Sequence, residues 1–83
     1  MMICFVDHLF HEKSRSNDFL RSVLSELGEV TVLTSSPDDP AMGDDKIVME
    51  FLNYQYDLWV FFQTEYVAAR LLPLGLTGAV IVP

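Results

Sequence analysis

The sequence is poor in cysteine and in basic residues. Its single cysteine, Cys4, cannot form an internal disulfide or a multi-cysteine zinc site, which suits a reducing cytosol. The 5 Lys+Arg residues stand against 12 Asp+Glu and are scattered along the chain, whereas nucleic acids are bound by clustered basic side chains. The net charge of -7 therefore argues against DNA or RNA as a partner.

A secretion signal and a membrane span are missing as well. The first residues carry no basic stretch, and Asp7 ends their apolar run far below the length that a signal peptide needs. Residues 67–82 are apolar enough to suggest a membrane span, but Arg70, Pro73 and two glycines break this stretch below the required length of about 18 residues. We expect a cytoplasmic protein without a transmembrane segment.

The composition is that of a folded chain. Hydrophobic residues make up 51% and charged residues 20%, far from the values of disordered segments. A chain of 83 residues buries only roughly 60 to 65% of its unfolded surface, so its core is marginal by itself. We expect residues 1–83 to form one domain, or part of one, that a partner or a further stretch of chain completes.

Four short apolar segments predict β-strands. Residues 3–6 and 58–62 are uninterrupted apolar runs, which is typical of strands covered on both faces in a parallel sheet. Residues 30–33 alternate at their start, as an edge strand does. Residues 79–82 form the last strand, which has no later element to cover it.

Three segments with helical spacing lie between these strands. Apolar residues recur at helical intervals over 19–27, before Gly28 ends the pattern. A second stripe runs over about 46–54, with Asp44 or Asp45 as the capping residue. The third helix follows Thr64, which we expect to cap it, and places Leu72 among its inward-facing residues before Pro73 ends it.

The alternation of strands and helices predicts an α/β fold. Short connections favour right-handed crossovers between parallel strands, which gives a Rossmann-like or flavodoxin-like three-layer sandwich. We expect four strands in the order 2-1-3-4, joined by three crossover helices. In such sheets ligands bind beyond the carboxyl ends of the strands where the order reverses, here between the first and third strands.

Two polar segments meet at that predicted crevice, one after each of these strands. Each leads into a helix N-terminus, where unpaired N–H groups favour an anion or sugar hydroxyls. The candidate site residues are Asp7, His8, Lys13, Ser14, Arg15, Gln63, Thr64 and Glu65. The chain contains neither a G-x-G-x-x-G dinucleotide fingerprint nor a G-x-x-x-x-G-K-[ST] phosphate loop, so no motif indicates nucleotide binding.

His8 is the candidate general base. Its unperturbed pKa of about 6.5 lets an imidazole take up a proton near neutral pH, and Asp7 could orient it. The alternative is a histidine that only packs or caps. His8 and His11 with Asp7 and Glu12 are chemically suited to zinc, but their spacing matches no ligand pattern, so we predict no metal site. Cys4 lies in the middle of a strand, where a packing role is expected.

The polar segments resemble GT-B-fold glycosyltransferases, in the first half of their N-terminal Rossmann-like domain. The resemblance lies in FVDH at 5–8, HEKSRSNDF at 11–19, YDLWVFFQTEY at 56–66 and AVIVP at 79–83. It implies a domain that holds the acceptor, a small molecule or glycan, while a missing C-terminal domain binds the nucleotide-sugar donor. It further implies no cofactor in this segment, no activity of the segment alone, and acceptor contacts from Asp7, His8, Lys13, Ser14, Arg15, Gln63 and Glu65.

The final strand separates two interpretations. Residues 79–82 are apolar throughout, and natural domains rarely leave such an edge open. We therefore favour a chain that continues into further elements. The alternative is a non-catalytic flavodoxin-like module that forms a homodimer through this strand, binds a partner, or takes an anionic metabolite at its helix N-termini.

Overall fold

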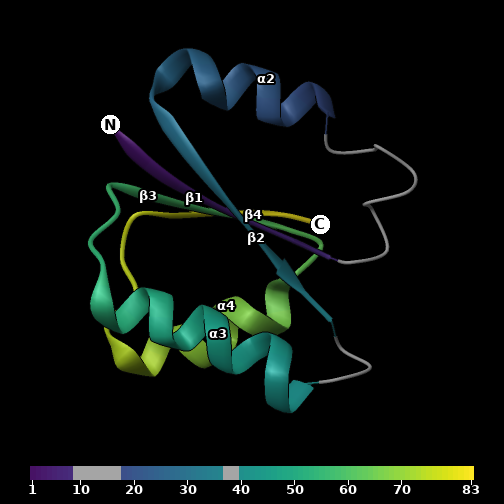
Figure 1. Cartoon of the computed structure of the whole chain (residues 1–83), viewed down its shortest axis with the longest axis vertical. Helices are drawn as coiled ribbons and strands as arrows, with labels where there is room; N and C mark the ends of the chain where they lie inside the picture. Colours follow the sequence, from purple (N-terminus) through teal and green to yellow (C-terminus); the bar gives the residue numbers. More distant parts are fainter. Residues whose placement is uncertain (9–17, 37–39) are drawn as a thin grey trace.

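The computed structural model describes residues 1–8, 18–36 and 40–83 and contains a parallel four-stranded sheet (Figure 1). The strands lie in the order β2-β1-β3-β4, which confirms the predicted α/β fold and its topology. In chain order the elements are β1 (Met2–His8), α2 (Asp18–Leu27), β2 (Glu29–Ser35), α3 (Pro40–Asn53), β3 (Leu58–Phe62), α4 (Glu65–Leu71), the 3-10 turn η1 (Leu72–Leu74) and β4 (Ala79–Val82).

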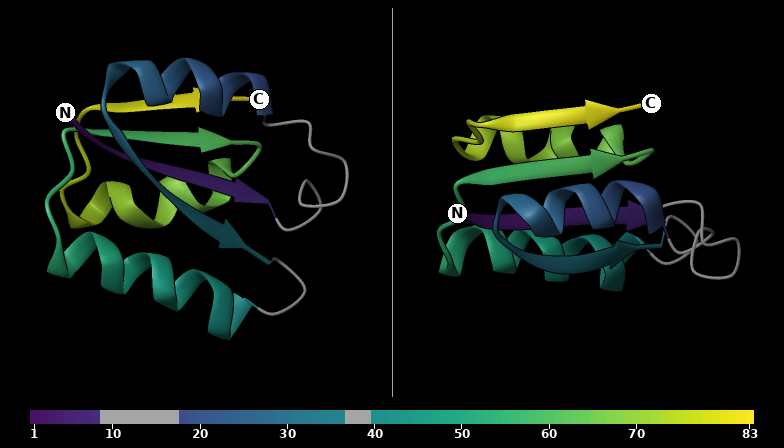
Figure 2. Two further views of the ribbon diagram at one scale, coloured as in Figure 1. Left: turned by 45° about the horizontal axis from the view of Figure 1, so that its top comes forward. Right: turned by 90° about the horizontal axis from the view of Figure 1, so that it is seen from above.

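The two faces of the sheet are covered unequally. Helices α3 and α4 lie together on one face, and α2 lies alone on the other (Figure 1). Seen from the α2 side, that helix crosses β1 and β2 but leaves β3 and β4 without a helix above them (Figure 2). The α2 face of β4 is therefore poorly covered, and Val80 on this face keeps 47% of its surface exposed.

Each face has its own apolar core, because successive strand residues point to opposite sides of the sheet. Under α3 and α4 the core consists of Cys4, Val6, Ile47, Trp59, Phe61, Val67, Ala68, Leu71 and Leu76. Under α2 it is smaller and consists of Ile3, Phe5, Leu24 and Val60. Phe19, the first residue of the apolar pattern predicted over 19–27, is 81% exposed, and of this pattern only Leu24 is buried against the sheet.

Strands β1 and β2 are longer than the sequence predicted. Their parallel ladder continues through Asp7 opposite Thr34 and through His8 opposite Ser35. Polar side chains do not end a strand when backbone pairing continues past the apolar run. The candidate residues Asp7 and His8 therefore belong to β1 itself and not to the loop that follows it.

Two helix boundaries also differ from the predictions. Helix α3 begins at Pro40, several residues before position 46, because proline lacks an N–H group and suits the first turn of a helix. Asp45 therefore lies within the helix and does not cap it, and its carboxylate pairs with Arg70 at 3.2 Å. Helix α4 ends at Leu71, and the tighter turn η1 rotates Leu72 outward to 60% exposure. Among the helices of the described chain, none is long and apolar enough to cross a membrane.

Candidate functional site

The carboxyl ends of all four parallel strands lie at one edge of the sheet, where the sequence predicted a site (Figure 2). β1 brings Asp7 and His8 to this edge, and Ser35 stands beside His8 at the end of β2. Gln63 and Thr64 follow β3, the neighbour of β1 on its other side. The fold therefore gathers polar residues that are far apart in the sequence.

Thr64 fixes the connection between β3 and α4. Its side chain is fully buried, and its hydroxyl donates a hydrogen bond of 3.1 Å to the carbonyl oxygen of Val6. The predicted side-chain cap of α4 is wrong, because this hydroxyl bonds to β1 and makes no cap hydrogen bond. Thr64 meets the helix through its own carbonyl, which accepts the N–H groups of Val67 and Ala68. The start of α4 is thereby held against the carboxyl end of β1.

Gln63 has a strained backbone. Its φ of 54° lies in the left-handed region, where it is the only residue other than glycine among those described. Its N–H group donates to the carbonyl oxygen of Val82 at 2.8 Å, which holds this conformation in place. Such strain costs on the order of 1 to 2 kcal/mol and often occurs at functional sites. The exposed Gln63 side chain at the predicted crevice fits that association.

The side chains of Ser35 and Tyr66 form a hydrogen bond that no sequence pattern predicted. The Ser35 hydroxyl and the Tyr66 phenol lie 2.9 Å apart, and either can donate the hydrogen bond. Ser35 is fully buried, whereas Tyr66 in the first turn of α4 is partly exposed. The sequence could have indicated these two residues only by their positions, because Ser35 follows a predicted strand and Tyr66 follows the candidate residue Glu65.

Asp7 is almost completely buried, with 3% of its surface exposed. Its Oδ1 accepts the backbone N–H of His8 at 2.8 Å, which fixes the carboxylate beside the end of β1. His8 is half-buried and faces the same edge region as Ser35 and Thr64. That Asp7 orients the His8 imidazole stays a prediction.

The remaining candidates divide into two groups. Glu65 is exposed in the first turn of α4, at the same edge as Gln63. Lys13, Ser14 and Arg15 lie outside the described residues, as do His11 and Glu12. Within the described ranges, no group of three or more His, Cys, Asp or Glu residues could hold a metal ion. Among the described candidates, the Gln63 amide and the Glu65 carboxylate are exposed and the His8 imidazole is half-buried, and these groups can hydrogen-bond a ligand with several hydroxyl groups.

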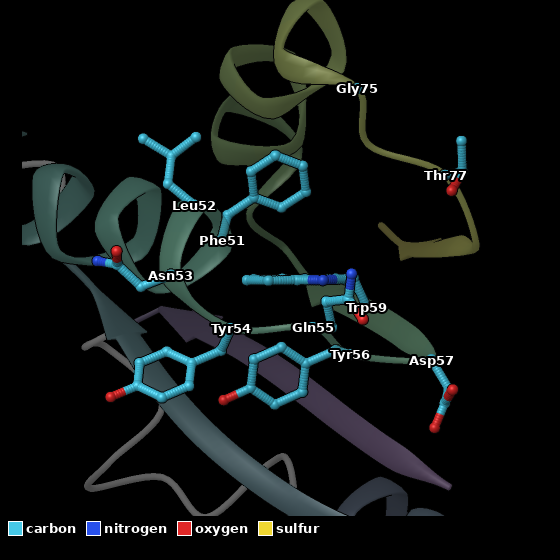
Figure 3. A pocket seen from close by; sticks show the side chains of 10 residues that line it. All are labelled: Phe51, Leu52, Asn53, Tyr54, Gln55, Tyr56, Asp57, Trp59, Gly75 and Thr77. Carbon is cyan, nitrogen blue, oxygen red and sulfur yellow. The ribbon is translucent and has the colours of Figure 1, made fainter.

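A second concave region lies at the opposite edge of the sheet, where β3 begins (Figure 3). We call it the amino-edge hollow; it has a volume of about 590 Å³. It is lined by Phe51, Leu52, Asn53, Tyr54, Gln55, Tyr56, Asp57, Trp59, Gly75 and Thr77. Trp59 belongs to the apolar run 58–62, which the sequence predicts to be a covered strand, and its burial confirms this. No sequence pattern indicates a binding role for the other residues of the hollow.

Two titratable side chains near this hollow are perturbed. Burial, followed by a hydrogen bond donated to Glu50, raises the pKa of Tyr56 to about 12. Burial also raises the pKa of the Cys4 thiol, and the negative charge of Glu50 adds to this effect. Cys4 therefore stays protonated at neutral pH, which fits a packing residue and not a nucleophile.

Comparison of the chain with protein-family models, with curated proteins and with solved structures found no match in any of the three.

Proposed function

We propose that this chain is the acceptor-binding, N-terminal part of a GT-B-type glycosyltransferase. In this proposal a C-terminal domain binds a nucleotide-sugar donor, and the carboxyl edge of the sheet described above holds the acceptor. The observation that carries the proposal is a pair of polar links at this edge, one buried and one partly buried. Thr64 bonds to Val6, and Ser35 bonds to Tyr66, so the ends of three elements are fixed around the half-buried His8 and the exposed Gln63.

The chemistry assigned to the edge is proton removal from an acceptor hydroxyl. The proton passes to an imidazole nitrogen of His8, and the acceptor oxygen forms a bond to the anomeric carbon of the sugar. The nucleotide leaves with the electron pair of the broken bond. In this proposal Asp7 holds the end of β1 in place, because its carboxylate accepts the backbone N–H of His8. The proton acceptor is the His8 imidazole, which lies on the other face of the strand.

A titration followed by amide NMR tests this proposal on the 83-residue chain. The probes are methyl α-glucoside, methyl α-mannoside and methyl β-galactoside as acceptors, with UDP-glucose as a donor. We expect at least one acceptor to shift the amides of His8, Gln63 and Tyr66, while UDP-glucose leaves them unchanged. Binding of UDP-glucose at this edge without any acceptor binding would overturn the assignment.

A second candidate function is supported by β4. Val80 and Ile81, on opposite faces of this strand, are 47% and 49% exposed, and β4 pairs only with β3 in the described sheet. Residues 71–83 contain no charged side chain, although the chain as a whole is strongly acidic. An uncharged apolar edge suits pairing with a second copy, as in a non-catalytic interaction module. Sedimentation equilibrium decides this point, since a monomer at all concentrations would remove the candidate.

A further inference from the structure

The amino-edge hollow is formed by three segments that lie far apart in the sequence. The end of α3 and the connection to β3 supply most of its wall, and Gly75 and Thr77 close it from the turn before β4 (Figure 3). Its volume of about 590 Å³ is within the range of ordinary ligand pockets, roughly 300 to 1,000 Å³. It is separate from the candidate acceptor site, because the two lie at opposite ends of the parallel strands (Figure 2).

The base of the hollow is preformed by packed aromatic rings. Trp59 lies between Phe51 and Tyr56 in Figure 3, with edge-on contacts at centroid distances of 5.7 Å and 5.3 Å. Its ring also stacks on Phe61 at 6.0 Å. Tyr56 is fixed further by the hydrogen bond that its hydroxyl donates to Glu50. Such interlocked rings keep their positions without a ligand, so little ordering is needed on binding.

The rim of the hollow is open and polar. Tyr54 is 62% exposed, and its ring lies beside that of Tyr56 (Figure 3). Asn53, Gln55 and Thr77 are exposed as well, and their amide and hydroxyl groups both donate and accept hydrogen bonds. Gly75 has a φ of 103°, and a Cβ atom built there would meet nothing within 4 Å, so this side of the hollow is empty space.

The one carboxylate among the described residues that line the hollow, that of Asp57, and the nearby carboxylate of Glu50 both accept hydrogen bonds from within the chain. Asp57 accepts the backbone N–H of Met2 on its Oδ2 at 2.7 Å, and Glu50 accepts the Tyr56 hydroxyl. An organic cation would use the aromatic ring faces and Asp57 but would leave the amide N–H groups of the rim without a partner. A sugar uses both properties of the rim, because its hydroxyls donate and accept hydrogen bonds while its C–H face packs on an aromatic ring.

We propose that the amino-edge hollow binds a neutral saccharide of about one or two sugar rings. Tyr54 supplies the exposed ring face, Asn53 and Gln55 bond to hydroxyl groups, and the Trp59 cluster holds the wall rigid. This inference goes beyond the proposed function, since the hollow is remote from His8 and takes no part in transfer. It gives the chain a second carbohydrate contact at the far end of the sheet.

Trp59 is the only tryptophan of the chain, so its fluorescence reports directly on the hollow. The 83-residue chain is titrated with maltose, lactose and methyl β-glucoside, and with choline chloride as a cationic probe. We expect a saturable change with at least one sugar and none with choline. Tyr54→Ala should weaken the binding at least about fivefold, because an aromatic contact is lost. Phe19→Ala, which removes an even more exposed aromatic ring from α2, should leave the binding unchanged.

Gln55→Ala provides a second variant in case Tyr54→Ala fails to fold, which circular dichroism detects. Absence of a saturable change with all three sugars would overturn the inference. Saturable binding of choline in place of the sugars would do so too, as would sugar binding that survives both rim variants. Amide shifts separate this result from the acceptor proposal, because sugar in the hollow shifts Gln55 and Thr77 and leaves Gln63 and Tyr66 unchanged.

Discussion

The hydroxyl of Ser35 and the phenol of Tyr66 lie 2.9 Å apart and join the end of β2 to the first turn of α4. Helix α4 follows β3, and β3 is separated from β2 in the sheet by β1. The hydrogen bond therefore spans the carboxyl end of β1 on the face that carries α3 and α4, which is the face of His8, whereas Asp7 lies on the other face. It makes this edge a fixed arrangement of polar groups and not a set of independent loop ends.

Tyr66→Phe tests the weight of this link. The change removes one hydroxyl and keeps the ring, so we expect the free energy of unfolding to fall by about 1 kcal/mol. Urea unfolding followed by Trp59 fluorescence measures the difference. Tyr54→Phe is the matched control: it removes the same hydroxyl from a ring exposed at the other edge, where a change within about 0.5 kcal/mol is expected. Equal effects of the two variants would contradict a structural role of the Ser35–Tyr66 bond.

Thr64→Val removes the hydroxyl that bonds to the Val6 carbonyl and keeps a side chain of similar shape. Because Thr64 is fully buried, the carbonyl loses a partner that water cannot easily replace, and we expect a loss of about 1 to 2 kcal/mol. Thermal and urea unfolding provide the measurement. Thr77→Val, at an exposed position, should be close to neutral. A neutral Thr64→Val would show that the bond to β1 does not hold α4 in place.

The sequence predicted the fold well because its decisive signals are local. The apolar runs at 3–6 and 58–62 can be satisfied only in strands covered on both faces, and short connections then determine the strand order. The location of Asp7 and Gln63 near the carboxyl ends of two strands could be predicted for the same reason, although β1 extends two residues beyond its apolar run. The Ser35–Tyr66 hydrogen bond was not predicted, because it depends on the position of α4 relative to β1 and β2, which the sequence does not specify. The role of Thr64 was predicted wrongly, because a threonine before a helix has the same sequence pattern whether its hydroxyl caps the helix or bonds to a neighbouring strand.

Alkaline pH should destabilise the fold. The folded state raises the pKa of Cys4 above its ordinary 9.0 and that of Tyr56 from 10.0 to about 12, in both cases chiefly by burial. Above pH 9 the unfolded chain therefore releases protons that the folded chain retains, so stability is complete below that pH and falls as pH rises. Urea unfolding between pH 7 and 12 should show the decline. Tyr56→Phe should flatten it between pH 10 and 12, and an unchanged curve would contradict the assignment.

The exposed edge strand β4 should make the chain self-associate. Ile81→Lys places a charge in the middle of this strand, which is how natural sheet edges avoid pairing. We expect sedimentation equilibrium to show concentration-dependent association of the unchanged chain and a shift to monomer in the variant. Leu72→Lys is the control, because this residue is similarly exposed but lies in η1, off the strand. Association that persists in Ile81→Lys would show that another surface is responsible.

Gln63→Gly should separate stability from ligand binding. Glycine adopts a φ of 54° without the clash that glutamine has, and after its own entropic cost the free energy of unfolding should rise by about 0.5 to 1 kcal/mol. The same change removes the exposed amide from the proposed acceptor site, so the amide shifts caused by methyl glycosides should weaken while stability increases. Gln55→Gly is the matched stability control, since Gln55 has no positive φ and the substitution there should destabilise. Opposite signs for the two variants would mean that the backbone at position 63 is strained in the folded state. A destabilised Gln63→Gly would instead mean that the glutamine side chain holds the turn together.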